Sequence, residues 1–537
     1  MAAATVTTAL EDPTPTNTAR NSATVATWTL VSRVTGLLRV VVIGAVLGPT
    51  YFANAFQTGY VVPNMVFTMI AGPVLAMVVV PGLVHAVGAG GVERAREVLS
   101  RVNGWLIAVS AALVALLMIL SPVVAWTLTF GIPDGDVHAR GLWITTLLML
   151  LIAPQIPLYV LLNLGIAAQQ ARGRFALAAG GQVVENGILI LTVVVAGWYY
   201  GTGLEFGQVP VQLVIVLGLG STVAVALHAM LQLFGTARVG LLARPSMRWR
   251  DDLEARAITR RLVRSIGVAA WPTAGMFVLL VLAGTVPGGT FVVQLSYSVF
   301  FALSYVSARA VSMAALPGLA HAAQSADGAS FGSAWRQSLS YAVIASLPLL
   351  VLLTALSVPT ANLLANGELR HADLIGPLAA CLVLVAVAQL VGGVHDIGRR
   401  ALFARLDDRI PRRASEVAFG AILGATAVAL LLPADSSRLI WLVAAILAGE
   451  LAAAGMVLTR LRRAIRPEPF LGTRGLTAAL VATLSIVPVA AAMWWLQRTN
   501  LGDRLADLAL LSLGGVVTLG VYVLVLRVAV RRIGGGL

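Results

Sequence analysis

The sequence contains no lysine, a single cysteine and few charged residues of any kind. Charged residues make up 11% of the 537-residue chain, whereas hydrophobic residues make up 58%. Soluble domains carry about a quarter charged residues, so this chain has too little charge to cover a water-exposed surface. The single cysteine, Cys381, excludes an internal disulfide and any metal site built from several cysteines. The six histidines are scattered and form no HExxH pair, a pattern of zinc enzymes.

In place of charge, the chain has a series of apolar runs of about 20 residues, each long enough to cross a hydrocarbon layer about 30 Å thick. Runs such as LVIVLGLGSTVAVALHAMLQL do not alternate between apolar and polar residues, as the strands of a membrane barrel do. The sequence therefore predicts an all-α polytopic membrane protein. The fourteen expected spans lie near residues 25–48, 56–86, 103–130, 141–168, 176–199, 209–236, 264–285, 290–322, 334–363, 374–401, 413–432, 438–460, 474–497 and 505–530.

The positive charge follows this topology. All 37 basic residues are arginine, and the formal net charge is +14. With the N-terminus inside, 29 arginines fall in inside segments and five in outside loops. This imbalance is the positive-inside pattern, so both termini are expected in the cytoplasm and no nucleic-acid partner is expected. The five outside arginines are Arg140, Arg370, Arg438, Arg498 and Arg504.

A short repeat indicates an internal duplication. The hexapeptide PGLVHA at residues 81–86 returns as PGLAHA at residues 317–322. The copies close the second and the eighth span, so the offset is six helices. Two pseudo-symmetric six-helix lobes, with two extra C-terminal helices, are typical of secondary transporters that bind their substrate between the lobes. Chance recurrence of a short string is the alternative.

The predicted organisation has five parts. They are a disordered cytoplasmic tail at residues 1–23, an N-lobe at 24–236, a cytoplasmic inter-lobe loop at 237–263, a C-lobe at 264–463, and the last two spans with a short tail at 464–537.

Three arginines fall inside predicted spans: Arg33 and Arg39 in the first and Arg309 in the eighth. An arginine at the centre of a bilayer costs about 2.5–3.5 kcal/mol on insertion scales, so it usually faces a cavity or a partner. Arg33 could alternatively reach back to the lipid headgroups. Arg39 lies roughly 9 Å deeper. Because guanidinium groups bind phosphate oxygens in a bidentate manner, these arginines indicate an anionic substrate.

The other ionisable residues within the spans are Glu185, Glu450 and the adjacent His395 and Asp396. Each glutamate could pair with a buried arginine or lie at the membrane interface, and the sequence leaves both roles open. We expect no metal and no cofactor.

The stretch SRVTGLLRVVVIGAVLGPTYFANAFQTGYVVPN resembles the start of the MurJ (MviN) family. The residues that carry the resemblance are Ser32-Arg33, Gly36, Arg39, Gly48, Asn54-Ala55-Phe56 and Pro63-Asn64. Two later stretches, GRFALAAGGQVVENGILI and LFARLDDRIPRR, resemble the turns that follow the family's fourth and tenth spans. The resemblance covers roughly residues 25–465 and fades over the last two spans.

This resemblance implies a member of the multidrug/oligosaccharidyl-lipid/polysaccharide exporter superfamily. The family flips lipid II, the undecaprenyl-pyrophosphate-linked peptidoglycan precursor, across the bacterial plasma membrane by alternating access. It implies two six-helix lobes and two further helices that form a groove for the lipid tail, with membrane lipids and cell-wall synthesis proteins as partners. The candidate substrate-binding residues are Arg33, Arg39, Asn54, Asn64, Ser298 and Arg309.

Several positions depart from the family pattern. The family's acid before Ala-Phe is Asn54 here, and its arginine pair in the second span corresponds to Phe67 and Thr68. Its arginine in the eighth span falls on Ser298, while Arg309 lies eleven residues further on. The predicted cavity thus keeps two of four characteristic arginines and gains one elsewhere.

Three functions remain open at this point. The first is a lipid II flippase, and the second is a transporter of the same superfamily for another polyprenyl-linked glycan or an amphiphilic metabolite. The third is an enzyme such as a polyprenyl-phosphate-dependent glycosyltransferase, which needs a carboxylate at the outer face. The first outer loop, PTYFANAF, contains no acid, and Asp134 and Asp136 in the second lack a supporting basic cluster. We therefore expect a transporter and not an enzyme.

Overall fold

The computed structural model describes residues 15–532 except 71, 134, 325–327, 372 and 500–503. In this part of the chain, all regular secondary structure is helical, and eleven segments are long and apolar enough to span a membrane. One of them, Leu75–Thr129, contains two helices joined at a kink where Gly90 and Gly91 leave helical backbone angles. The less apolar helices α8 (Leu253–Ala283) and α15 (Arg409–Ala429) provide two more crossings. The predicted all-α fold with about fourteen spans is confirmed.

The first six spans form the N-lobe. Their helices are α1 (Pro15–Leu47), α2 (Tyr51–Ile70), α3 (Gly72–Thr129), α4 (Gly135–Ile152), α5 (Gln155–Ala171), α6 (Ala176–Tyr200) and α7 (Val211–Arg238). The second span combines α2 with the first part of α3, and the fourth combines α4 with α5. Residues 15–23, which we expected to be disordered, are helical, because Pro15 suits the first turn of a helix and no breaker follows it. Residues 1–14 lie outside the described part.

The C-lobe and the two last spans follow a connection that contains a short 3₁₀ helix, η1 (Trp249–Asp251). The eighth span is divided at Ser307, which leaves helical backbone angles between α9 and α10. The remaining helices are α9 (Gly289–Val306), α10 (Ala308–Gln324), α11 (Gly328–Ala355), α12 (Ser357–Leu364), α13 (Glu368–His371), α14 (Ile375–Ala404), α16 (Ser436–Ile465), α17 (Thr473–Thr499) and α18 (Arg504–Arg532).

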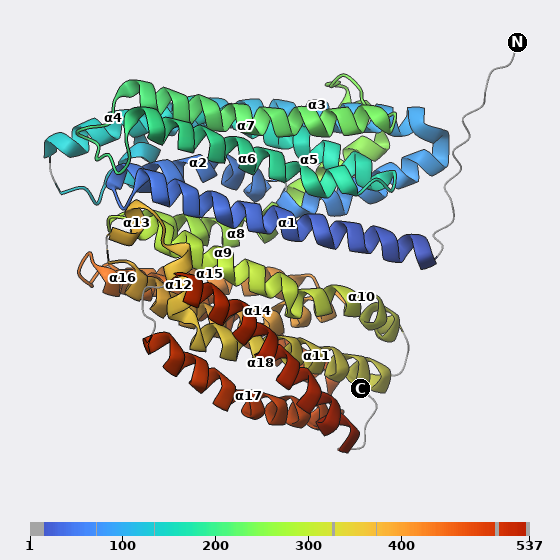
Figure 1. Ribbon diagram of the computed structural model, residues 1–537. Coiled ribbons are helices and arrows are strands. Elements are labelled where there is room, and N and C mark those ends of the chain that lie inside the picture. The colour runs from blue at the N-terminus through green and yellow to red at the C-terminus, as the bar shows by residue number, and fades with distance from the viewer. Residues whose placement is uncertain are drawn as a thin grey trace, which may run out of the picture.

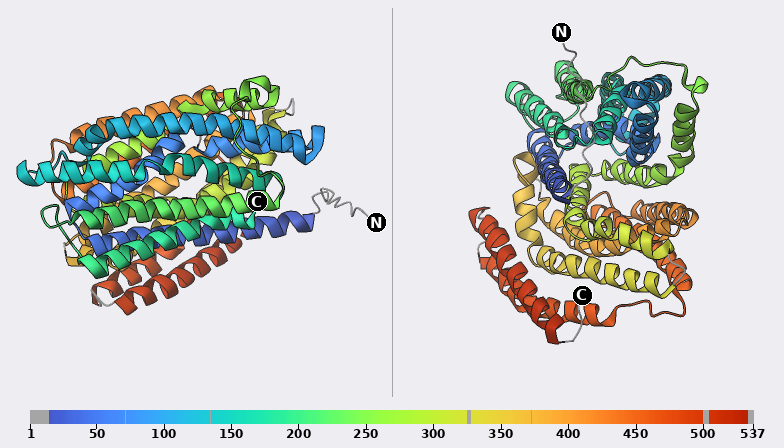
Figure 2. Two further views of the ribbon diagram at one scale, coloured as in Figure 1. Left: turned by 90° about the horizontal axis from the view of Figure 1, so that it is seen from above. Right: turned by 90° about the vertical axis from the view of Figure 1, so that its right-hand side faces the viewer.

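The lobes lie side by side, with α1 next to the C-lobe (Figure 1). Helices α17 and α18 pack on α11 and α12 along the outer side of the C-lobe (Figure 2). Helix α1 begins and α18 ends at the same end of the bundle. We name this the Pro15 end, and the opposite end, where α1 stops, the Leu47 end.

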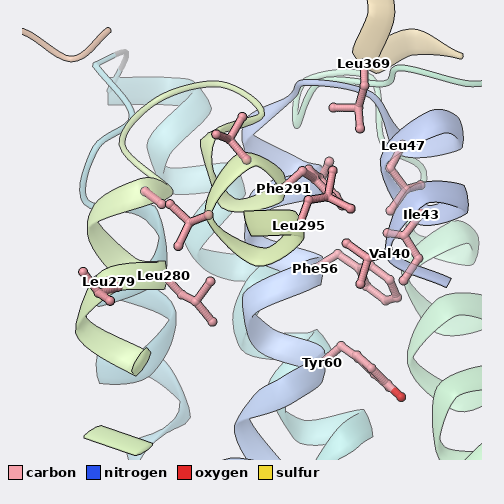
Figure 3. Close-up of a cluster of buried hydrophobic side chains, with 14 of the residues drawn as sticks. Val40, Ile43, Leu47, Phe56, Tyr60, Leu279, Leu280, Phe291, Leu295 and Leu369 are labelled. Carbon is pink, nitrogen blue, oxygen red and sulfur yellow. The ribbon is translucent and has the colours of Figure 1, made fainter. Parts of the chain in front are cut away.

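A large buried hydrophobic cluster joins the lobes at the Leu47 end. There, side chains of α1 and α2 form one buried cluster with side chains of α8, α9 and α13 (Figure 3). The labelled members are Val40, Ile43, Leu47, Phe56, Tyr60, Leu279, Leu280, Phe291, Leu295 and Leu369. At the Pro15 end the C-lobe has a core of its own, and the N-lobe core there includes residues from the start of α8.

The connection between the lobes is attached to the N-lobe. Asp252 caps α8, and its carboxylate also accepts hydrogen bonds from Arg94, at 2.6 Å, and from Arg101, both on α3. Helix α8 begins at Leu253, ahead of the seventh span expected from residue 264, and Ile258 in its second turn belongs to the N-lobe core. The start of the seventh span is therefore held by the lobe that precedes it.

Candidate functional site

Arg39 lies in a polar cluster inside the N-lobe. Its Nη1 donates hydrogen bonds to the hydroxyl of Tyr60, at 3.2 Å, and to the amide oxygen of Asn186, at 2.9 Å. The guanidinium also lies over the Tyr60 ring, 5.2 Å from its centre. Its Nε is buried and has no hydrogen-bond partner among the described residues. Arg39 is thus held in place while part of its donor capacity stays unused.

Glu185 supplies the negative charge of this cluster. One carboxylate oxygen, Oε1, accepts hydrogen bonds from the hydroxyls of Tyr60 (3.2 Å) and Tyr159 (3.3 Å). The other, Oε2, lies 2.8 Å from Nδ1 of His228 on α7. Since the Tyr60 hydroxyl contacts both Arg39 and Glu185, it connects the two charges. We call Arg39, Tyr60, Tyr159, Glu185, Asn186 and His228 the N-lobe polar cluster.

Two arginines meet at one tyrosine between the lobes. The Arg33 guanidinium donates to the Tyr305 hydroxyl at 3.2 Å and lies 4.6 Å from the centre of its ring. The Arg309 guanidinium lies 4.4 Å from the same centre, and its Nε is buried without a hydrogen-bond partner among the described residues. Cation–π contacts of this kind stabilise a guanidinium without neutralising it. Among the described residues, neither Arg33 nor Arg309 forms an ion pair with a carboxylate, so both keep their positive charge.

Two acids of the C-lobe spans, Glu450 and Asp396, are paired with other side chains. Glu450 on α16 lies 2.8 Å from Nδ1 of His395 on α14. Asp396 accepts hydrogen bonds from Arg399, at 2.6 Å, and Arg400, at 3.0 Å. Glu450, like Glu185, is therefore paired with a histidine of another helix.

Asn54 lies in the contact that joins the lobes at the Leu47 end. It is 1% exposed, and its Nδ2 donates to the backbone oxygens of Gly284 (3.3 Å) and Val286 (2.8 Å), in the turn between α8 and α9. Its Oδ1 accepts from the N–H of Thr290 at 3.3 Å. An aspartate could accept the last bond but could not donate the first two. The asparagine therefore suits this contact where the family pattern has an acid.

The last two candidates make local contacts. Asn64 is exposed and accepts a hydrogen bond from Thr68, at 3.4 Å. The Ser298 hydroxyl donates to the backbone oxygen of Gln294 in its own helix, at 2.8 Å. Phe67, at a position where the family has an arginine, is buried and stacks on Tyr159, with ring centres 6.3 Å apart. That position therefore belongs to the N-lobe core.

Four residues that organise these clusters were not predicted from the sequence: Tyr60, Tyr159, His228 and Tyr305. A charged residue stands out in an apolar span, whereas a tyrosine resembles any other large side chain there. A list of every hydrogen-bonding side chain inside the spans would have included all four.

Sequence comparisons place the chain among known proteins. The profile of the family described as lipid II flippase MurJ matches residues 43–505. A probable lipid II flippase MurJ of Vibrio cholerae is 28% identical over 251 residues, which are 46% of each chain. A protein of the same description from Haemophilus influenzae is 25% identical over 229 residues, 42% of this chain and 43% of its own. The aligned part thus spans about half the length of these relatives.

Solved structures share the fold. A lipid II flippase MurJ in an inward closed conformation superposes with a TM-score of 0.71 at 14% identity, over 95% of this chain and 99% of its own. An inward-facing multidrug resistance MATE family transporter of the MOP superfamily gives a TM-score of 0.61 at 15% identity, over 80% and 94%. Since the family profile covers both lobes and most of the chain, this protein belongs to the lipid II flippase MurJ family.

Proposed function

We propose that this protein flips lipid II across a bacterial plasma membrane by alternating access of its two lobes. The observation that carries the proposal is the family match through residues 43–505, which extends across both lobes and includes Arg309. Arg33 and Arg39 lie just before the matched residues. The activity is transport, and no residue is assigned a catalytic role.

The arginine distribution supports an orientation with the Pro15 end, and both chain termini, in the cytoplasm. Arg140 donates to the backbone oxygens of Phe206 (2.8 Å) and Val209 (3.0 Å) in the loop that follows α6 at the Leu47 end. It is one of the five arginines that the sequence predicts on the outer side. In this orientation the lobes are packed together on the outer side, so substrate reaches the arginines from the cytoplasmic leaflet.

Arg33, Arg39 and Arg309 are the proposed contacts for the pyrophosphate of the substrate. Arg33 and Arg309 come from opposite lobes to one tyrosine ring, and a pyrophosphate offers two adjacent phosphates to such a pair. Asn64 and Ser298 stay proposed substrate contacts, with no part of the substrate assigned to them. Asn54 is proposed to close the outer side rather than to bind substrate, because its three hydrogen bonds are used between the lobes.

Complementation tests the proposal. The gene is introduced into a bacterium whose own lipid II flippase is depleted, alongside a double variant, Arg33→Ala with Arg309→Ala, at matched membrane abundance. Arg412→Ala is the matched control, because Arg412 pairs with Glu416 on the exposed face of α15, at 3.3 Å. Growth with the wild type and the control, and loss of growth with the double variant, is the expected result.

A second candidate is a transporter of the same superfamily for another polyprenyl-linked glycan. The observation that favours it is the buried Phe67, which removes a family arginine from the cavity. Failure of the wild type to complement, with correct membrane insertion verified, would favour this candidate and contradict the first.

A further inference from the structure

The hydrogen bonds beyond His228 fix the orientation of two buried amides. Nε2 of Gln169 lies 3.1 Å from the backbone oxygen of Gly165 and 3.4 Å from that of Gln232, so this atom is the donating nitrogen. It also donates to Oε1 of Gln232, at 2.7 Å. Nε2 of Gln232 in turn donates to the backbone oxygen of Leu177, at 3.1 Å. The Gln232 amide therefore presents its N–H groups away from Gln169.

This orientation determines which nitrogen of His228 carries the proton and whether Glu185 is ionised. Nε2 of Gln232 is 3.3 Å from Nε2 of His228, and an amide nitrogen can only donate, so the histidine nitrogen accepts. Nδ1 of His228 then carries the proton and donates to Oε2 of Glu185, at 2.8 Å. His228 is neutral, and Glu185, which accepts from His228 and two tyrosines, is an ionised carboxylate. Its balancing cation is Arg39.

The charged and titratable groups around Glu185 come from four neighbouring helices. They are Arg39 on α1, Tyr60 on α2, Tyr159 on α5 and His228 on α7. Glu185 is 4% and His228 is 3% exposed. A Cβ on Gly181 would collide with His228 and Gln232, so the glycine leaves the space that the pair occupies. Glu185 and His228 are therefore buried together and held in place by side chains from several helices.

Arg39 is the one cation of this cluster, and it is also a proposed contact for the substrate. A pyrophosphate at its unused Nε and Nη2 would place a second anion beside Glu185. One guanidinium cannot offset both charges, and a buried carboxylate without its counter-charge takes up a proton. The phenol groups of Tyr60 and Tyr159 remain hydrogen-bonded to the carboxyl group after it is neutralised, so the site can hold either form.

We propose that Glu185 is a proton-binding site which loads one proton from solvent when an anionic lipid engages Arg39 and releases it when the lipid leaves. This inference rests on the proposed function. The step is protonation of a carboxylate alone: a solvent proton adds to an oxygen of Glu185, and no other bond forms or breaks. Because coupling between two ligands is reciprocal, protonation of Glu185 also strengthens anion binding at Arg39.

The experiment measures protons taken up on binding. The full chain in lipid nanodiscs is titrated with lipid II bearing a short prenyl chain, by calorimetry in buffers of different ionisation enthalpy, between pH 5.5 and 8. The phosphates of this pyrophosphate diester stay ionised over that range, so they contribute no protons of their own. Up to one proton per bound lipid is expected, with an affinity that falls as the pH rises, by at most about tenfold per pH unit.

Glu185→Gln keeps the shape of the side chain and removes the proton site. It is expected to bind lipid II without proton uptake and with an affinity independent of pH, about tenfold tighter than the wild type at pH 8. Glu205→Gln is the matched control, because Glu205 is a carboxylate in the loop between α6 and α7, outside the N-lobe polar cluster. The control is expected to keep the proton uptake of the wild type.

Binding of lipid II by the wild type without proton uptake would overturn this inference and leave the proposed function intact. Unchanged proton uptake in Glu185→Gln would overturn it as well. Absence of lipid II binding in the wild type is a different result, which would overturn the proposed function and this inference together. If the variant does not fold, the proton uptake of the wild type is still sufficient to test the inference.

Discussion

Arg33 and Arg309 belong to different lobes, yet their guanidinium groups lie 4.6 Å and 4.4 Å from the centre of one ring, that of Tyr305. Both groups are positively charged, and each contact with the aromatic ring stabilises its guanidinium by about 0.5–2 kcal/mol without neutralising it. An anion bound between the lobes would neutralise the positive charge that remains on Arg33 and Arg309. The contact also crosses the interface that would change in the proposed alternating-access cycle, so in that proposal it links substrate binding to the position of the lobes.

The first prediction concerns this tyrosine. Tyr305→Leu removes the ring beneath both arginines and is expected to weaken lipid II binding by about tenfold or more, since both guanidiniums lose their position. Tyr305→Phe keeps the ring and loses only the hydroxyl that accepts from Arg33, so a smaller loss is expected. Equilibrium binding in nanodiscs measures both. Equal affinities for the two variants would mean that the ring does not organise the arginines.

The second prediction concerns Arg39. Arg39→Ala is expected to abolish transport, and Arg39→Lys to impair it, because lysine keeps the charge but loses the bidentate fork. Each charge-assisted hydrogen bond to phosphate contributes about 1.5–3 kcal/mol, which corresponds to a tenfold to hundredfold loss of affinity. Transport is measured at matched membrane abundance, with Arg412→Ala as the control. Full activity of Arg39→Ala would remove Arg39 from the proposed site.

The third prediction concerns closure at the Leu47 end. Asn54→Asp replaces two donated hydrogen bonds by contacts between a carboxylate and the backbone oxygens of Gly284 and Val286. Each bond lost with a buried acceptor costs about 1–3 kcal/mol, so the lobes are expected to separate more often at this end. Spin-label distances across the Leu47 end of the substrate-free protein measure the shift. Asn64→Asp, an exposed asparagine in the same helix, is expected to leave the distances unchanged.

The fourth prediction concerns the cap of α8. Burial would raise the pKa of Asp252, but hydrogen bonds from the N–H of Ala255 and from Arg94 outweigh it and lower that pKa. Such a carboxyl group stabilises the folded protein at every pH above its pKa in the unfolded chain, which is about 3.9. This stabilisation is lost as the pH falls through the lower pKa of the folded protein. The contribution of Asp252 to the free energy of unfolding is therefore expected to be constant between pH 5 and pH 8.

Removing the carboxylate should destabilise the protein at all those pH values. Asp252→Asn leaves Arg94 and Arg101 without their shared acceptor, and a loss of about 2–4 kcal/mol is expected. Asp251→Asn, at the exposed neighbouring position, is the control and is expected to change stability by less than about 0.5 kcal/mol. Denaturation in detergent measures both, and similar losses in the two variants would contradict the prediction.

The fifth prediction concerns movement of the lobes. Thr202, in the loop after α6, donates to the Glu368 carboxylate of α13 at 2.8 Å, which joins the lobes at the Leu47 end. Cysteines at both positions, with Cys381→Ala as the background, place a short thiol cross-linker across this contact. Cross-linking is expected to stop transport, and its chemical cleavage to restore it, while substrate binding is retained. Undiminished transport by the cross-linked protein would exclude alternating access.

Hydropathy and arginine placement were sufficient to predict the helical class and the number of spans, because both depend on the bilayer rather than on packing. The breaks inside spans were not predictable in the same way. Ser307 interrupts the eighth span without a proline or a glycine at the break, and α8 starts at Leu253 because Asp252 finds two arginines of another helix. Such contacts depend on which helices become neighbours.

The candidate site shows the same division. The arginines within the spans were evident in the sequence, since charge in an apolar run has few explanations. Their partners were not, because Glu185 and His228 lie 43 residues apart on different helices, and Arg33 and Tyr305 lie 272 apart. The expectation that Asn54 binds substrate rested on its place in a family motif, and its hydrogen bonds instead lie between the lobes.

The attachment of α17 and α18 to α11 and α12 has a practical consequence. Helix α18 packs on the C-lobe, and α1 packs mainly with α6 of the N-lobe. The two ends of the described chain therefore belong to different lobes but lie at the same end of the bundle. A donor fluorophore beside Pro15 and an acceptor beside Arg532 would therefore act as a ruler across the lobes, leaving every transmembrane side chain unaltered.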